Sequence, residues 1–167
     1  PIVRISRSAV IVALTLQFPL LPSDLSAQTF WTAGTADWNS ASNWTLGVPN
    51  AASGTTFDAI IGNAGRAQLT GPPIGSVRRL RVGVAAGGGG NLEVGGTTLN
   101  ITENVHLNEG SSGVATMTVQ NAATVNSPST IIGYSSNSNT SMTIKGAGTT
   151  YNASIQFVVG NAGTGEP

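Results

Sequence analysis

A repeat of about 25 residues organises the second half of the chain and constrains its fold more than any other feature. One column of the repeat is apolar and recurs at intervals of 25 residues: Leu92, Met117 and Met142. A second column consists of asparagines at intervals of 26 residues: Asn100, Asn126 and Asn152. Columns that agree on one period predict successive copies of a single structural unit.

Each copy has the chemistry of short β-strands. Leu92 and Val94 flank Glu93, and this alternation of apolar and polar residues is typical of a strand with one buried face. Clusters such as Gly87–Gly90 separate the strand-like segments, and glycine is too frequent for helices. We therefore expect each period to contain three short strands joined by turns.

Stacking of successive periods buries the apolar faces and pairs the strand edges, which a single period cannot do alone. The sequence therefore predicts an all-β fold, a right-handed parallel β-helix (β-solenoid) with about 25–26 residues per turn and ~4.8 Å between turns. In that stack, Asn100, Asn126 and Asn152 either form an amide ladder or are ordinary turn asparagines.

We assign residues 56–167 to the solenoid. The segment Thr56–Val82 is predicted to be a degenerate extra turn, interrupted by the insertion Gly71-Pro72-Pro73. The final turn begins at Phe157 and stops at Pro167 in the middle of a repeat. We therefore expect the solenoid to be a fragment that is truncated at its C-terminus.

All three tryptophans lie between the first residues and the repeats, in a segment that we predict to be an N-terminal cap (residues 28–55). A solenoid end needs a cover with an apolar inner face, and Trp31, Trp38 and Trp44 supply large apolar area in few residues. The alternative is that these three rings form a platform on which carbohydrate stacks.

Residues 1–27 have the order of a secretory signal peptide. Arg4 and Arg7 precede an apolar run, Ala9–Leu21, which a short polar stretch follows up to Ala27. The run is too short to span ~30 Å of hydrocarbon as a helix. We therefore expect export of the protein, with cleavage after Ala27.

The cap and the repeats together resemble a known group of exported proteins. The residues that carry the resemblance are Trp38-Asn39, Asn43-Trp44, Gly47, Pro49-Asn50, Ile132-Gly133-Tyr134 and Ser141–Thr149. They resemble the passenger regions of bacterial autotransporter-like (type V secretion) proteins and related PEP-CTERM surface proteins, over most of residues 29–167. The resemblance implies a β-helical passenger that is secreted or displayed at the outer-membrane surface, and membrane contact only through a secretion apparatus or a C-terminal anchor.

Composition excludes several classes of function. Seven basic residues balance seven acidic ones, so the formal net charge is zero, and only 8% of residues are charged. A nucleic-acid-binding surface needs basic residues to displace counterions, so we expect no nucleic-acid partner. The chain has no cysteine and one histidine, which excludes a Cys/His zinc site, and we expect no metal and no cofactor.

The ionisable residues form no recognisable catalytic motif. Glycoside hydrolysis needs paired carboxylates, whereas Glu93, Glu103 and Glu109 fall on different predicted strands or turns. His106 lies between two apolar residues, so we expect it to point outward as a lone surface side chain. The run Arg78–Arg81 is predicted to be a solvated strand face or edge guard, with an anion site as the alternative. We therefore expect no catalytic residues and no enzymatic activity.

Two hypotheses about function follow. The first is a non-catalytic exported surface module, a structural stalk or an adhesive repeat that contacts a host surface or a polysaccharide. The second is a carbohydrate-binding or carbohydrate-active β-helix that uses Trp31, Trp38 and Trp44 or has active residues elsewhere.

Overall fold

The structure is a computed structural model that describes residues 27–49, 57–72, 75–84, 88–109, 113–134 and 139–160. The predicted signal peptide lies outside the described residues, apart from Ala27, which begins the first strand. The end of the last repeat, residues 161–167, also lies outside them.

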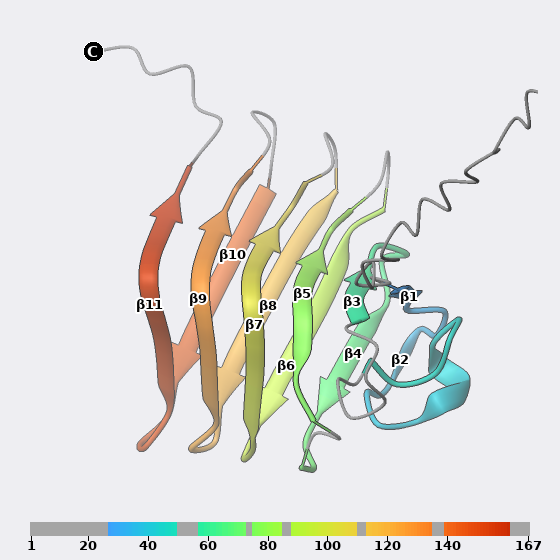
Figure 1. The fold of residues 1–167 in the computed structure, drawn as a ribbon, viewed down its shortest axis with the longest axis horizontal. Helices are drawn as coiled ribbons and strands as arrows, with labels where there is room; N and C mark the ends of the chain where they lie inside the picture. Colours follow the sequence, from blue (N-terminus) through green and yellow to red (C-terminus); the bar gives the residue numbers. More distant parts are fainter. Residues whose placement is uncertain are drawn as a thin grey trace, which may run out of the picture.

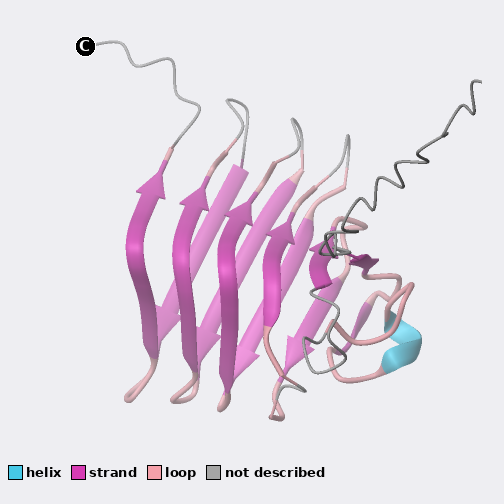
Figure 2. Cartoon of the chain, in the orientation of Figure 1, coloured by secondary structure: helices cyan, strands magenta, loops and turns pink. Residues whose placement is uncertain are grey.

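The described chain is a solenoid of two facing parallel sheets (Figure 1). The six-stranded sheet contains, in order, β1 (Ala27–Phe30), β3 (Phe57–Ile61), β5 (Val77–Val82), β7 (Thr98–Leu107), β9 (Thr124–Ile132) and β11 (Thr150–Val159). The five-stranded sheet contains β2 (Thr35–Asp37), β4 (Arg66–Leu69), β6 (Gly90–Gly95), β8 (Val114–Gln120) and β10 (Asn139–Lys145). In Figure 1 the chain runs up the nearer, six-stranded sheet and down the more distant, five-stranded sheet while it advances from right to left, so the solenoid is right-handed, as predicted. One short 3-10 helix, η1 (Ala41–Asn43), is the helical part of the described chain (Figure 2).

The predicted stacking columns are confirmed residue by residue. Leu92 pairs with Met117, and Met117 pairs with Met142, in the five-stranded sheet. The extra turn expected between Thr56 and Val82 is also present, because β3 and β4 pair in register with β5 and β6. The core between the sheets is built from these inward columns, and Leu92 and Met117 are almost completely buried in it.

Each full coil contains two strands and not the three that the sequence predicted. The expected third and first strands of successive periods are one continuous strand, as in β7, which runs from Thr98 to Leu107. A register shift between Asn100 and Asn104 lets the strand bend without ending. A β-bulge of this kind increases the local twist while pairing resumes on either side, so no turn is needed there.

The asparagine column forms an amide ladder, which resolves the two alternatives in favour of the ladder. Asn126 Nδ2 donates to Asn100 Oδ1 at 2.8 Å, and Asn152 Nδ2 donates to Asn126 Oδ1 at 2.8 Å. The three residues lie inside β7, β9 and β11 and not in turns. The ladder therefore ties three successive coils along the solenoid axis.

One corner of the coil is built in the same way four times. The residues that follow β5, β7, β9 and β11 are Gly83, Asn108, Gly133 and Gly160, with φ of 78°, 62°, 75° and 77°. Each of their backbone N–H groups donates to the carbonyl of the preceding coil, at 2.7 to 3.0 Å. The chain therefore turns in the left-handed conformation without losing a hydrogen bond between coils, and glycine and asparagine tolerate this conformation best.

Met117→Asp tests the inward columns. The substitution places a charge in the core between the sheets, and we expect it to lower the free energy of unfolding by more than about 4 kcal/mol. Thr143→Asp on β10 is the matched control, because Thr143 is exposed, and we expect a change within about 0.5 kcal/mol. Chemical denaturation followed by circular dichroism gives both values, and similar values for the two variants would contradict the column assignment.

Asn126→Ala and Asn152→Ala test the ladder. Asn126 takes part in two ladder hydrogen bonds and Asn152 in one. At about 1 kcal/mol for each bond, we expect Asn126→Ala to cost about twice as much stability as Asn152→Ala. Equal losses, measured in the same denaturation experiment, would show that the amide bonds do not carry the stability.

Candidate functional site

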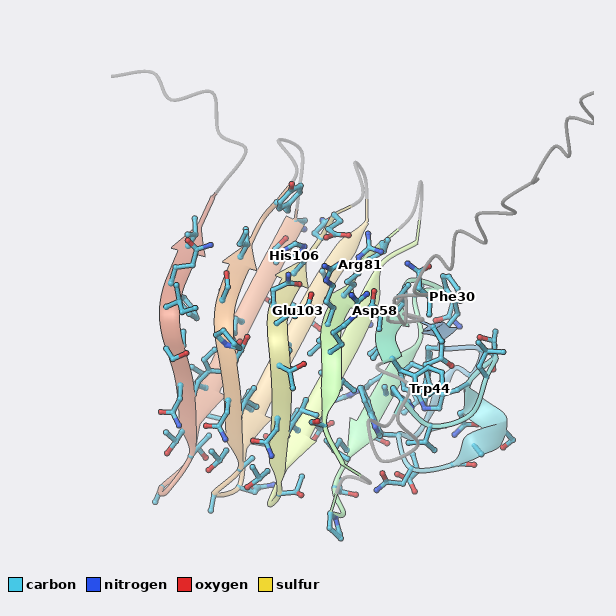
Figure 3. The ribbon with its side chains drawn as sticks, in the orientation of Figure 1. Phe30, Trp44, Asp58, Arg81, Glu103 and His106 are labelled. Atoms are coloured by element: carbon cyan, nitrogen blue, oxygen red, sulfur yellow. The ribbon has the colours of Figure 1, made fainter. Side chains whose placement is uncertain are left out.

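Most ionisable side chains in the described part of the chain gather on three neighbouring strands of the six-stranded sheet. We call them the charged cluster, and it consists of Asp58, Arg78, Arg79, Arg81, Glu103, His106 and Glu109. Figure 3 labels four of its members across β3, β5 and β7. Strand register brings them together, because Asp58 pairs with Arg79 and Arg81 pairs with His106 in adjacent coils.

Asp58 and Arg78 form the best-buried ion pair of the cluster. Arg78 Nε and Nη2 each donate to one carboxylate oxygen of Asp58 at 2.9 Å, and the Asp58 side chain is 2% exposed. The hydrogen bonding of Arg78 to the Asp58 carboxylate is the main cause that raises the pKa of Arg78, and burial opposes it. A bidentate pair of this geometry fixes β3 against β5 and satisfies a carboxylate that would otherwise be costly to bury.

Glu103 joins the next coil to this pair. Its carboxylate accepts from Arg79 Nε at 2.6 Å and from Arg78 Nη1 at 3.5 Å. All three arginines of Arg78–Arg81 therefore contact carboxylates, since Arg81 pairs with Glu109. The predicted solvated strand face is in fact a set of ion pairs between coils, and the pairing also disfavours the alternative of an open anion site.

His106 points outward, as predicted, but it is not a lone side chain. Its Nδ1 contacts the carboxylate of Glu109, which also accepts a hydrogen bond from Arg81. The imidazole stacks on the ring of Tyr134, with centroids 5.1 Å apart and planes inclined by 22°. Burial raises the pKa of Glu109, but the hydrogen bonds from His106 and Arg81 outweigh burial, so the pKa lies below its usual value. Because Arg81 and His106 lie one coil apart at paired positions, the 25-residue period was the signal that could have placed Arg81 close to Glu109.

Glu93 lies apart from Glu103 and Glu109, on the five-stranded sheet. Its carboxylate accepts from Gln68 Nε2 at 3.2 Å and also contacts Arg66 and Gln120, so that it links three coils. Beside it is a hollow of about 340 Å³, lined by Thr35, Ala64, Arg66, Asn91, Leu92, Thr116 and Thr118. Among the described residues, no three side chains of the types Asp, Glu, His or Cys are grouped so as to hold a metal ion.

The three tryptophans pack against one another beside the first coil. Trp31, Trp38 and Trp44 are 2%, 1% and 4% exposed, and their rings meet edge to face with centroids 5.1 and 4.8 Å apart. Trp44 Nε1 donates to the Trp38 carbonyl at 2.8 Å. A platform for sugar stacking needs an exposed ring face, so the geometry argues against the alternative of a carbohydrate contact at these residues. Their burial is what the predicted apolar cap requires.

The cluster as a whole acts between coils. Its three carboxylates and three guanidinium groups neutralise one another, and its ion pairs join residues 20 to 28 positions apart in the chain, apart from the local contact of His106 with Glu109. Such pairs hold neighbouring strands in one register. The arrangement is therefore suited to clamping coils and leaves no open charge for a ligand of opposite sign.

Glu109→Gln tests the cluster. At pH 7 the substitution weakens charge-assisted bonds to Arg81 and His106, and we expect a loss of about 1–2 kcal/mol in the free energy of unfolding. The pKa of Glu109 is lowered in the folded state, so its stabilising effect is present above its ordinary value of 4.5 and is lost as pH falls through the lower folded value.

The difference in free energy of unfolding between wild type and Glu109→Gln should therefore shrink as the pH falls from about 5 to about 3. Urea denaturation at several pH values measures this difference. Lys145→Gln, which removes an exposed charge on β10, is the control for loss of a charge and should stay within about 0.5 kcal/mol of wild type. A difference that does not change with pH would contradict the assignment.

Comparisons of the chain with protein-family models, with curated proteins and with solved structures found no match. No helix within the described residues has the length and apolar character needed to cross a membrane. The functional inference therefore depends on the geometry of the coils and on the sequence itself.

Proposed function

We propose that the protein is a non-catalytic, exported β-solenoid that serves at the bacterial surface as a structural stalk or an adhesive repeat module. The observation that carries the proposal is the identical way in which successive coils are joined. The columns through Met117 and Asn126 recur at the same place in adjacent coils. Added coils lengthen such a rod without changing its cross-section.

The outward columns support an adhesive role. Thr98, Thr124 and Thr150 are paired across three coils, directly beside the asparagine ladder. Together they make a grid of uncharged hydrogen-bonding groups, spaced by ~4.8 Å along the axis and by ~6.6 Å along each strand. A surface that repeats one group at fixed spacing suits weak contacts made many times over, which gain strength through multivalency.

The order of residues 1–27 and the resemblance to autotransporter-like and PEP-CTERM surface proteins support the export part of the proposal. A carbohydrate-binding β-helix is the second candidate. The burial of Trp31, Trp38 and Trp44 disfavours carbohydrate binding through the tryptophans. A hollow beside the asparagine ladder favours carbohydrate binding at a different place.

Fusion of the chain to an alkaline phosphatase without its own signal tests export. In a Gram-negative host, we expect phosphatase activity in the periplasm with residues 1–27 present, and a loss of at least tenfold when they are deleted. Equal activity from both fusions would contradict export.

The same fusion protein, purified and pulled by its ends, tests the stalk. We expect repeated force peaks with contour increments of about 80–90 Å, since about 25 residues at ~3.5 Å each are released per coil. A chain that extends without force peaks cannot bear load, and that result would contradict the stalk role.

A further inference from the structure

Strand β9 contains one residue fewer than each neighbouring strand over the same stretch of the coil. The stretch begins at the ladder asparagine and ends at the apolar residue with which it stays paired near the strand end, and in β9 it runs from Asn126 to Ile132. The matching stretches, 100–107 in β7 and 152–159 in β11, each contain one residue more. The difference is taken up by the register shifts between Asn100 and Asn104 and between Ala153 and Gln156.

A hollow of about 260 Å³ lies where β9 is short. It is lined by Ile101, Asn126, Ser127, Pro128, Asn152 and Ser154. Pro128 belongs to the shortened stretch of β9 and has no N–H to donate to a neighbouring strand. The extra residues of β7 and β11 have no counterpart on β9, and residues of all three strands line the hollow.

The lining has an apolar part and a polar part. Pro128 is half-buried and supplies apolar atoms, while Asn126, Asn152 and Ser154 supply two amides and a hydroxyl. Ile101 also lines the hollow, but it belongs to the core and is only 4% exposed. Within the ladder, each Nδ2 donates one of its two hydrogens, so each amide keeps a second N–H for a ligand. The remaining lining residue, Ser127, directs its hydroxyl to the Ser129 carbonyl at 2.8 Å.

We propose that this hollow binds one neutral sugar ring of a polysaccharide, and the proposal rests on the adhesive part of the proposed function. None of the six lining residues is ionisable, which favours an uncharged ligand. A sugar ring has apolar C–H faces and a hydroxyl edge, which match Pro128 on one side and the amides of Asn126 and Asn152 on the other. The volume is just below the ~300–1,000 Å³ that drug-sized ligands occupy, which suits a single ring.

The neighbouring threonine column extends the site along the axis. Thr98, Thr124 and Thr150 lie two residues before the ladder asparagines on the same face. Their hydroxyl groups repeat at the coil spacing of ~4.8 Å, in the direction in which further units of a polymer would run. The bound polysaccharide is therefore expected to lie across the strands, parallel to the solenoid axis.

Titration of the full chain with defined oligosaccharides tests the proposal. The probes are the neutral hexamers cellohexaose, laminarihexaose, mannohexaose and chitohexaose, with hexagalacturonate as the acidic counterpart. The readout is the NMR shift of the Nδ2–H groups of Asn126 and Asn152. We expect saturable shifts at both residues with at least one neutral hexamer, and none with hexagalacturonate.

Ser154→Leu places an apolar side chain at the rim, and we expect it to weaken binding at least tenfold. Ser141→Leu is the matched control, because Ser141 is an equally exposed serine in the opposite sheet, and it should leave binding unchanged. The proposal is overturned if no neutral hexamer gives a saturable shift, if hexagalacturonate binds equally well, or if Ser154→Leu binds like wild type.

This outcome is distinguishable from failure of the proposed function. Export and force peaks without oligosaccharide binding would leave the stalk role intact and reject the sugar site. Oligosaccharide binding by a chain that is not exported would support the site and reject the surface role.

Discussion

Hydrogen bonding between successive coils is the constraint on which the rest of the structure depends. One coil alone leaves the backbone groups of both its strands unpaired and its apolar side chains uncovered. Pairing with the next coil solves both problems, but only in one register, because a shift by a single residue would turn every inward side chain outward. The nearly constant period in the sequence is the consequence, and Met117 lies between Leu92 and Met142 for that reason.

Side-chain contacts between coils depend on the backbone register, because only this register brings their partners to neighbouring positions. The ladder through Asn126 and the bidentate pair of Arg78 with Asp58 each join residues that are 20 or more positions apart. Both kinds of contact hold neighbouring strands at one offset. They differ in what they offer to a ligand. The charges of the ion pairs neutralise one another, whereas each ladder amide that donates within the ladder has a second N–H that can donate to a ligand.

The repeat made much of the fold predictable, and what it left out has physical causes. Columns such as Leu92 with Met117 follow from period and polarity alone. The period also aligned the asparagines, but only the structure distinguished a ladder from ordinary turn asparagines. The number of strands per coil did not, because a bulge near Asn104 replaces the turn that the spacing suggested. The contact of Arg81 with Glu109 joins residues 28 positions apart, and only an explicit overlay of coils, which pairs Arg81 with His106, reveals it. The hollow at Pro128 depends on a single missing residue between neighbouring coils.

The corner residues Gly83, Asn108, Gly133 and Gly160 have a consequence for how such a protein evolves. Each of these four coils brings its own left-handed corner, with its hydrogen bond to the coil before it. Tandem duplication of a segment that encodes one complete coil thus yields a protein that folds without compensating changes elsewhere. Smaller insertions or deletions fit within a strand that bulges, as β9 and its neighbours illustrate, or in a connection between strands, such as the one between β4 and β5, which is longer than that between β6 and β7. Growth by whole coils and diversification by single residues are therefore separate genetic events in this architecture.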